Sequence, residues 1–185
     1  ASKLEANLSG KALLKMEDNI TTDHIMPSDS KLLPYRSNVP KLSEYCLTPV
    51  DPTFPERAKA EGGGFLIAGH NYGQGSSREH AALAPLYLKI RGVIAKSFAR
   101  IHRANLINNG ILPLTFQTEA DYDRFSLGNE LALDNVRALV ESGAEIIPVT
   151  NVTKGFTVNT VLALSARQRS MILAGGLINM IKEQG

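Results

Sequence analysis

Residues Phe65–His80 have the sequence FLIAGHNYGQGSSREH, and this stretch gives the strongest indication of the fold. Its first four residues are apolar and are followed by glycine, which predicts a short buried strand. The later glycines and the Ser-Ser-Arg run predict a tight turn and the start of a helix. A strand that leads through a turn into a helix is the repeating unit of an α/β fold.

The same turn is a candidate site for an anionic substrate. Successive backbone N–H groups at a glycine-rich turn attract anions, and a helix N-terminus adds partial positive charge. Arg78 carries a fork of donors that matches a carboxylate or a phosphate. The alternative is ordinary helix-start chemistry, in which serine caps N–H groups and glycine relieves the turn. The stretch matches neither a Walker loop nor the dinucleotide fingerprint.

A regular alternation of elements surrounds this turn. We expect strands over 65–68, 92–95, 111–116, 130–133, 145–149 and 156–163, and helices over 77–84, 97–108, 119–125 and 165–182. Ser165 and Gln168 have the spacing of a capping box. Two strand–helix–strand units predict parallel strands with right-handed crossovers, and the later strands predict antiparallel pairing. The prediction is an α/β fold with a mixed, largely parallel sheet and a ligand at the carboxyl ends of strands.

The length of 185 residues predicts a single domain over 1–185. Residues 1–18 carry little pattern and are expected to form a lead-in. Residues 31–64 are rich in proline, glycine and charge, and form either a functional loop or a partly helical segment with short helices over 41–46 and 55–60. Residues 65–185 are the expected main α/β body.

Composition limits the classes of function. The chain is 43% hydrophobic and 21% charged, and its net charge of +2 is too small to argue for a nucleic-acid surface. No apolar run is long enough to span a membrane, and the first residues do not resemble a secretion signal. The single cysteine, Cys46, excludes an internal disulfide and a metal site built from several thiolates of this chain. We therefore expect a reducing, cytoplasmic location, with the mitochondrial matrix left open.

A second constellation precedes the main body. Residues 18–27 have the sequence DNITTDHIMP, and residues 34–38 have the sequence PYRSN, which places Arg36 on a loop. Two arginines on separate loops suit a di- or tricarboxylate, because each guanidinium can bind one carboxylate with two hydrogen bonds. The simpler interpretations are a solvated loop arginine and a structural turn at Asp23 and His24, in which the aspartate caps the backbone.

Together these segments resemble the C-terminal swivel domain of the aconitase family. The resemblance rests on Asp18–Ile25, on Tyr35 and Arg36, on Asn71–Ala82, and on Lys96–His102 with Gly110–Leu114. It implies a three-layer, swivelling β/β/α domain. It also implies a lyase of the tricarboxylic acid cycle that interconverts citrate and isocitrate through cis-aconitate at an iron–sulfur [4Fe–4S] cluster. The chain looks closer to single-chain aconitate hydratase than to the small subunit of isopropylmalate dehydratase, which shares the Gly-Ser-Ser-Arg-Glu string.

The resemblance assigns roles to residues of the glycine-rich turn. Ser76 corresponds to the general base that takes the carbon-bound proton of the substrate. Its proton must be made easier to lose, and Arg78 and the backbone N–H groups of the turn at Gly75 are suitable helpers. Arg78 also corresponds to a carboxylate-binding arginine, and Ser77 to a neighbouring hydroxyl that binds substrate.

Other positions receive roles in the same way. Arg36 corresponds to the arginine of a mobile loop that recognises another substrate carboxylate. Asp23, like Gly75, is expected to support the site. His80 and His102 lie within matching strings, and we expect them to pack or to form hydrogen bonds.

The resemblance also implies a partner. The cysteines that hold the cluster, and the His/Asp pair that handles the departing hydroxyl, belong to other domains of the family, and Cys46 is not at a ligand position. We therefore expect this chain to be inactive alone and to need cluster-bearing N-terminal domains or a large subunit. The start without an initiator methionine favours an excised C-terminal domain over a natural small subunit.

Two alternatives stay open. The chain could be the small subunit of isopropylmalate or homoaconitate dehydratase; Arg36 favours a third carboxylate, because an isopropyl group needs no guanidinium. It could instead be the RNA-binding module of an iron-regulatory aconitase relative. Basic residues are present at Arg91, Lys96, Arg100 and Arg103, but the lack of an aromatic stacking platform and the small net charge argue against nucleic acid.

Overall fold

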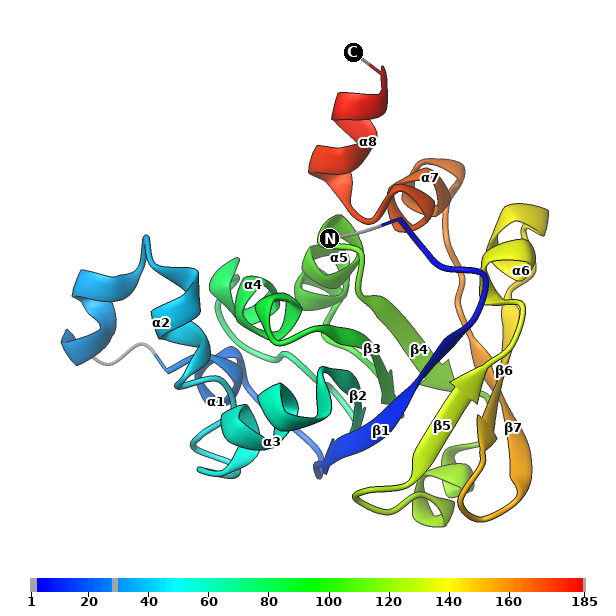
Figure 1. Cartoon of the computed structure of the whole chain (residues 1–185), viewed down its shortest axis with the longest axis horizontal. Coiled ribbons are helices and arrows are strands. Elements are labelled where there is room, and N and C mark those ends of the chain that lie inside the picture. Colours follow the sequence, from blue (N-terminus) through cyan, green and yellow to red (C-terminus); the bar gives the residue numbers. More distant parts are fainter. Residues whose placement is uncertain (1–2, 28–29, 185) are drawn as a thin grey trace.

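The computed structural model describes residues 3–27 and 30–184. Within them the strands form one closed barrel in the order β1-β2-β3-β4-β7-β6-β5 (Figure 1). The strands are β1 (Leu8–Lys15), β2 (Gly64–Ala68), β3 (Ile90–Ala95), β4 (Leu112–Phe116), β5 (Glu130–Leu133), β6 (Ile146–Asn151) and β7 (Phe156–Val161). Neighbours from β1 to β4 pair in parallel, and the pairs that involve β5, β6 or β7 are antiparallel. The α/β fold with a mixed sheet is confirmed, whereas closure into a barrel is a feature that the sequence pattern does not predict.

Helices lie outside the barrel. They are α1 (Thr22–Ile25), α2 (Val39–Ser43), α3 (Phe54–Glu61), α4 (His80–Tyr87), α5 (Arg100–Asn108), α6 (Val136–Ser142), α7 (Ala166–Ala174) and α8 (Leu177–Gln184), with 3₁₀ helices over Ser30–Tyr35 and Glu119–Arg124. Figure 1 shows α1 to α4 gathered on one side, away from β5, β6 and β7. The helices of residues 31–64 therefore belong to this layer, as the partly helical alternative predicts.

Strand β2 shows how the layers are built. Its residues are buried on both faces, so its side chains enter two apolar clusters alternately. Phe65 and Ile67 pack with residues of β4 to β7, whereas Leu66 and Ala68 pack with residues of α1 to α4. The parallel strands thus lie between a helical layer and an antiparallel layer, which is the expected β/β/α arrangement.

The expected lead-in is wrong over Leu8–Lys15, because this segment is strand β1. It pairs with β2 in parallel and with β5 antiparallel, so it closes the barrel. Its sequence LSGKALLK does not alternate between apolar and polar residues, and its burial follows no period of two. Residues 1 and 2 of the expected lead-in lie outside the described residues.

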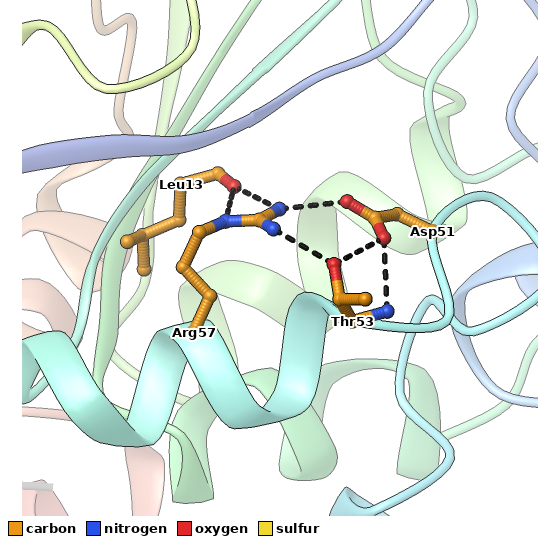
Figure 2. A network of polar contacts seen from close by, with 4 residues as sticks. All are labelled: Leu13, Asp51, Thr53 and Arg57. Carbon is orange, nitrogen blue, oxygen red and sulfur yellow. Dashed lines mark hydrogen bonds and ion pairs between the residues drawn. The ribbon is translucent and has the colours of Figure 1, made fainter.

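A polar network joins α3 to β1 (Figure 2). The register of β1 on β2 shifts between Ala12 and Leu14, and the Leu13 carbonyl accepts hydrogen bonds from Nε and Nη2 of Arg57 at 2.9 and 2.6 Å. Nη2 also contacts Asp51 Oδ2 at 2.9 Å. Hydrogen bonds from Thr53 and from Arg57 lower the pKa of the Asp51 carboxyl. The Leu13 carbonyl, at the irregularity in β1, therefore receives its hydrogen bonds from a side chain of the helical layer.

Several helix boundaries differ from the expectation, and one helix is missing from it. The helix expected over 77–84 is α4, which begins at His80 and continues through Pro85. The helix expected over 165–182 has the predicted capping box at Ser165. It ends at its C-cap, Gly175, which has a left-handed φ of +88°, and α8 is a separate helix after it. Helix α6 lies where no helix is predicted. Propensity and periodicity locate a helix better than its ends.

No helix in the described part of the chain combines the length and the apolar character needed to cross a membrane.

Candidate active site

The carboxyl ends of three parallel strands meet at one edge of the barrel. Lys15 of β1 pairs with Ile67 of β2, and Ala68 of β2 pairs with Ala95 of β3. The segments that follow these strands therefore leave from the same place. They are residues 16–21, the segment Gly69–Glu79, which we call the serine loop, and residues 96–99. The glycine-rich turn and the first part of the second constellation lie on this edge, whereas Arg36 lies elsewhere, beside α4.

Backbone hydrogen bonds hold the serine loop on both sides. On the β1 side, Gly73 N–H donates to Ile20 at 2.7 Å, and Thr22 N–H donates to Gln74 at 2.9 Å. On the β3 side, Tyr72 forms an isolated parallel bridge with Phe98, and its N–H donates to Ser97 at 3.1 Å. The loop is thus a narrow continuation of the sheet as far as Gln74, and the residues after Gln74 emerge from a fixed point.

Side chains fix the beginning of the serine loop. Ser97 Oγ accepts the N–H of Asn71 at 2.8 Å and lies 3.1 Å from His70 Nδ1. His70 Nε2 lies 2.6 Å from Glu119 Oε1, and the His70 N–H donates to Asp18 Oδ1 at 2.7 Å. Because Ser97 accepts from the backbone, its hydroxyl proton is available for Nδ1, and Nε2 then donates to the carboxylate.

Gly73 leaves room for the ring of His102. A Cβ at Gly73 would lie 2.3 Å from that ring, and the φ of +89° also favours glycine. His102 is 2% exposed and packs edge-on against Tyr72 with ring centroids 5.5 Å apart. Neither ring nitrogen has a hydrogen-bond partner among the described residues. Burial lowers the pKa of His102 to about 4, so at neutral pH the ring is an uncharged packing group beneath the loop.

Ser76 and Ser77 lie on the exposed part of the loop. Asn105 Nδ2 of α5 approaches Ser77 Oγ at 3.4 Å. Within the described part of the chain, no backbone acceptor pairs with the N–H groups of Ser76, Ser77 or Arg78. These groups are therefore available to an anion, although α4 begins at His80, so its positive end is farther from Ser76 than the sequence predicts.

Arg78 forms an ion pair with α1. Its Nη2 lies 3.0 Å from Asp23 Oδ1, with the Arg78 side chain 30% exposed and that of Asp23 60% exposed. The Nε atom of Arg78 is buried and has no partner among the described residues. A partly exposed pair of this kind is worth about 1 kcal/mol or less. The pair orients the guanidinium more than it stabilises the fold.

Arg36 lies in the turn that follows the first 3₁₀ helix, and it is exposed. Its carbonyl oxygen accepts a hydrogen bond from His80 Nε2 at 2.7 Å. The loop of Arg36 is therefore tied to the first residue of α4, two residues after Arg78. His80 has the hydrogen-bonding role that its position predicts.

The turn at Asp23 is capped by other residues than expected. Thr21 Oγ1 accepts the His24 N–H at 3.1 Å, and His24 Nδ1 accepts the Thr21 N–H at 2.9 Å. These reciprocal bonds form a capping box at the start of α1. Asp23 is thus not the cap, and its carboxylate faces Arg78 instead. Thr21 and His24 already have the spacing of a capping box in the sequence, which is the signal that could have found them.

The residues of this chain do not fit an iron–sulfur cluster. Among the described residues, no group of three or more histidine, cysteine or acidic side chains could hold a metal ion. Cys46 is fully buried, and burial raises the pKa of its thiol. A cluster ligand must be a thiolate, so Cys46 is unsuited to that role.

The edge thus combines hydroxyl, guanidinium and open N–H groups. The guanidinium and the N–H groups can bind carboxylates, and a hydroxyl beside them can exchange a proton with a bound substrate. Sequence reasoning finds Ser76, Ser77 and Arg78 but misses the groups that hold the loop. These are Asp18, Ile20, Thr22, His70, Ser97 and Asn105, whose partners are far away in sequence.

Comparisons with known proteins find clear relatives of this chain. Residues 35–119 match the family model of the aconitase C-terminal domain. The chain is 38% identical to the small subunit 2 of 3-isopropylmalate dehydratase from Archaeoglobus fulgidus, covering 92% of this chain and 93% of that protein. It is 36% identical to an Emericella nidulans protein named as a mitochondrial aconitate hydratase, covering 96% of this chain and 25% of that protein.

A solved structure gives the same result. The crystal structure of 3-isopropylmalate dehydratase from Methanocaldococcus jannaschii superposes with a TM-score of 0.77 at 30% identity, covering 96% of this chain and 95% of the other. The chain therefore spans almost all of two dehydratase chains, but only about a quarter of the longer aconitate hydratase.

Proposed function

Since this chain belongs to the aconitase family, as an aconitase C-terminal domain or a dehydratase small subunit, we propose that it completes the active site of a hydro-lyase that interconverts citrate and isocitrate through cis-aconitate. In this proposal the chain supplies the base and the carboxylate-binding groups. The cluster is held by N-terminal domains or by a large subunit, in the cytoplasm or the mitochondrial matrix.

Ser76 is the proposed general base, and its Oγ takes the proton from the substrate carbon. A serine hydroxyl is a very weak acid, so the oxygen must be stabilised when it carries negative charge. The unpaired N–H groups of Ser76, Ser77 and Arg78 and the nearby guanidinium can provide this stabilisation. The exposure of Ser76, on a loop that backbone hydrogen bonds hold in place, supports this role.

Arg78 is the proposed partner of one substrate carboxylate. Its ion pair with Asp23 uses Nη2, and the rest of this planar group of donors is proposed to bind the carboxylate. Ser77 is proposed to donate a hydrogen bond to the same substrate. Its contact with Asn105 keeps the hydroxyl on the open side of the loop.

The observation that carries the choice of substrate is the attachment of Arg36 to α4. The His80–Arg36 hydrogen bond holds a second guanidinium-bearing loop beside the one that carries Arg78. Two such loops suit an acid with carboxylates on both sides of the reacting carbons. A substrate with an apolar branch would leave one guanidinium without a partner, at a cost in binding.

A second candidate is the small subunit of isopropylmalate or homoaconitate dehydratase. It is favoured by the match to almost the whole length of two 3-isopropylmalate dehydratase chains. In that case a separate large subunit would bring the cluster, and with isopropylmalate as substrate Arg36 would bind a group other than a third carboxylate. Homoaconitate, with its carboxylates, is compatible with both arginines.

The deciding experiment measures hydration of cis-aconitate and of isopropylmaleate by this chain joined to its cluster-bearing partner, reconstituted with iron and sulfide without oxygen. Turnover of cis-aconitate with little turnover of isopropylmaleate supports the proposal. The reverse preference keeps the family and the role of Ser76 but rejects the substrate. Arg36→Leu is the next variant in either case, because it tests the group that should discriminate between these acids.

A further inference from the structure

His24 has no role in the proposed chemistry, although it lies one residue from Asp23. We propose that His24 is a positioning residue for the substrate-binding edge. By accepting the N–H of Thr21, its Nδ1 holds the short turn that presents Asp23 to Arg78 and anchors Gln74 of the serine loop. The consequence for substrate binding rests on the proposed function, whereas the hydrogen bond itself does not.

The geometry fixes the protonation of the ring. A backbone N–H can only donate, so Nδ1 of His24, 2.9 Å from Thr21 N, must be an unprotonated acceptor. The ring proton is then on Nε2. Protonation of His24 would place a second donor opposite the Thr21 N–H, and this half of the capping box would be lost.

The turn depends on its caps, because α1 has only four residues. A single helical turn is unfavourable by itself, since it fixes several residues for one or two hydrogen bonds. The remaining support comes from burial of Thr22 and Ile25 and from the reciprocal bonds of Thr21 and His24. Loss of the histidine acceptor should therefore loosen the whole turn.

Two links carry this effect to the substrate-binding edge. Thr21 forms a parallel bridge with Gln74, and the Thr22 N–H donates to the Gln74 carbonyl at 2.9 Å, two residues before Ser76. Asp23 Oδ1 lies 3.0 Å from Arg78 Nη2. Both links start within the residues that the capping box encloses, so their geometry depends on that box.

Histidine is an unusual choice at this position, because capping boxes normally use glutamate or glutamine there. Its ring nitrogen nevertheless supplies the same acceptor for the Thr21 N–H. Substrate binding should therefore depend on a residue that does not touch the substrate.

Two substitutions of His24 test its role as an acceptor. His24→Gln keeps a side-chain acceptor for the Thr21 N–H. His24→Leu removes the acceptor. The matched control is Gln168→Leu, which breaks the equivalent capping box of Ser165 and Gln168 at the start of α7.

In the complete enzyme, we expect His24→Leu to raise KM for cis-aconitate by roughly fivefold at pH 8, the factor that matches a typical capping contribution. His24→Gln should stay within about twofold of the unmodified enzyme at that pH. Gln168→Leu should lower stability and leave KM unchanged. An unchanged KM in His24→Leu, or a KM in His24→Gln that rises as much as in His24→Leu, would overturn the inference.

A measurement on this chain alone distinguishes the two proposals. The protection factor of the Thr21 amide against hydrogen exchange should fall in His24→Leu relative to the unmodified chain, but not in His24→Gln. Equal protection in the three chains rejects the role of His24 whatever the activity. Failure of the unmodified enzyme to hydrate cis-aconitate rejects the proposed function and leaves the exchange result standing.

Discussion

Ser76 lies in the exposed part of the serine loop. Backbone hydrogen bonds hold the preceding part of this loop on both sides. The Ser76 side chain is exposed, while Gln74, two residues earlier, is bonded to the β1 side. The Ser76 hydroxyl is thus carried by a rigidly held segment. The proposed proton transfer needs such a support, because small displacements of the proton acceptor are costly. The same residues would serve less well on a loop held at one end.

The proposed base leads to a prediction at this scale. Ser76→Ala should lower kcat for cis-aconitate by roughly 10²- to 10⁴-fold in the complete enzyme, while KM changes by less than about threefold, because the carboxylate-binding groups remain. Steady-state kinetics measure both quantities. Ser170→Ala on α7 is the control, since that hydroxyl donates to the Ala166 carbonyl of its own helix. Turnover within about tenfold of the unmodified enzyme would rule out Ser76 as the base.

Gly73 leads to a second prediction, which concerns stability. Gly73→Ala should lower the free energy of unfolding by about 2–4 kcal/mol, because its Cβ would overlap the His102 ring and its φ of +89° would become strained. Gly62→Ala is the matched control: its φ is +71°, but nothing lies within 4 Å of the added Cβ. It should cost only about 1–2 kcal/mol. Urea unfolding measures both, and equal losses would show that the contact with His102 contributes nothing.

Among the helices, α5 packs against the serine loop and supports it. It contributes His102 beneath Gly73 and Asn105 beside Ser77. The His102 ring is buried among Tyr72 and the loop backbone without a hydrogen-bond partner in the described residues. Such a ring is tolerated only while it is neutral.

Stability should therefore depend on pH through this helix. An unfolded histidine binds its proton near pH 6.5, whereas folded His102 binds it only near pH 4. Between these values the unfolded state holds more protons, so the free energy of unfolding falls as the pH is lowered, by up to about 3 kcal/mol. Urea titrations from pH 7 to pH 4 measure this slope. His102→Gln should flatten it whatever its effect on stability at pH 7, and an unchanged slope would exclude His102 as its source.

At the scale of the whole molecule, β1 joins the two halves of the sheet. It pairs with β2 of the parallel half and with β5 of the antiparallel half, and its residues enter both apolar clusters. The segment after β1 also carries Ile20, Thr22 and Asp23 to the serine loop. The barrel and the site therefore share one strand.

Removal of residues 1–15 should abolish cooperative thermal unfolding, because it opens the barrel and leaves β2 and β5 with exposed edges. Circular dichroism and calorimetry measure the transition. The control is Lys3→Ala, which removes only the exposed Lys3–Glu183 ion pair and should shift the midpoint little. A truncated chain that still unfolds in one sharp transition would show that closure by β1 is dispensable.

The sequence by itself determined the local units and the chemistry they carry. The apolar run Phe65–Ala68, the glycine turn after it and the Ser165–Gln168 capping box are signals between near neighbours, and the structure contains β2, the serine loop and the cap of α7 at these places. The Ser-Ser-Arg string also identified the candidate site, since residue types and spacing suffice to recognise anion-binding groups.

How these units are joined is seen only in the folded structure. Strand β1 has no alternating pattern, because it lies between two cores and carries an irregularity at Leu13 that Arg57 satisfies. The start of α4 at His80, the packing of His102 under Gly73 and the contact of Asp23 with Arg78 all depend on residues tens of positions apart. Periodicity and propensity describe neighbours along the chain, whereas closure of the barrel and the support of the site come from contacts between distant segments, and those contacts exist only in the folded state.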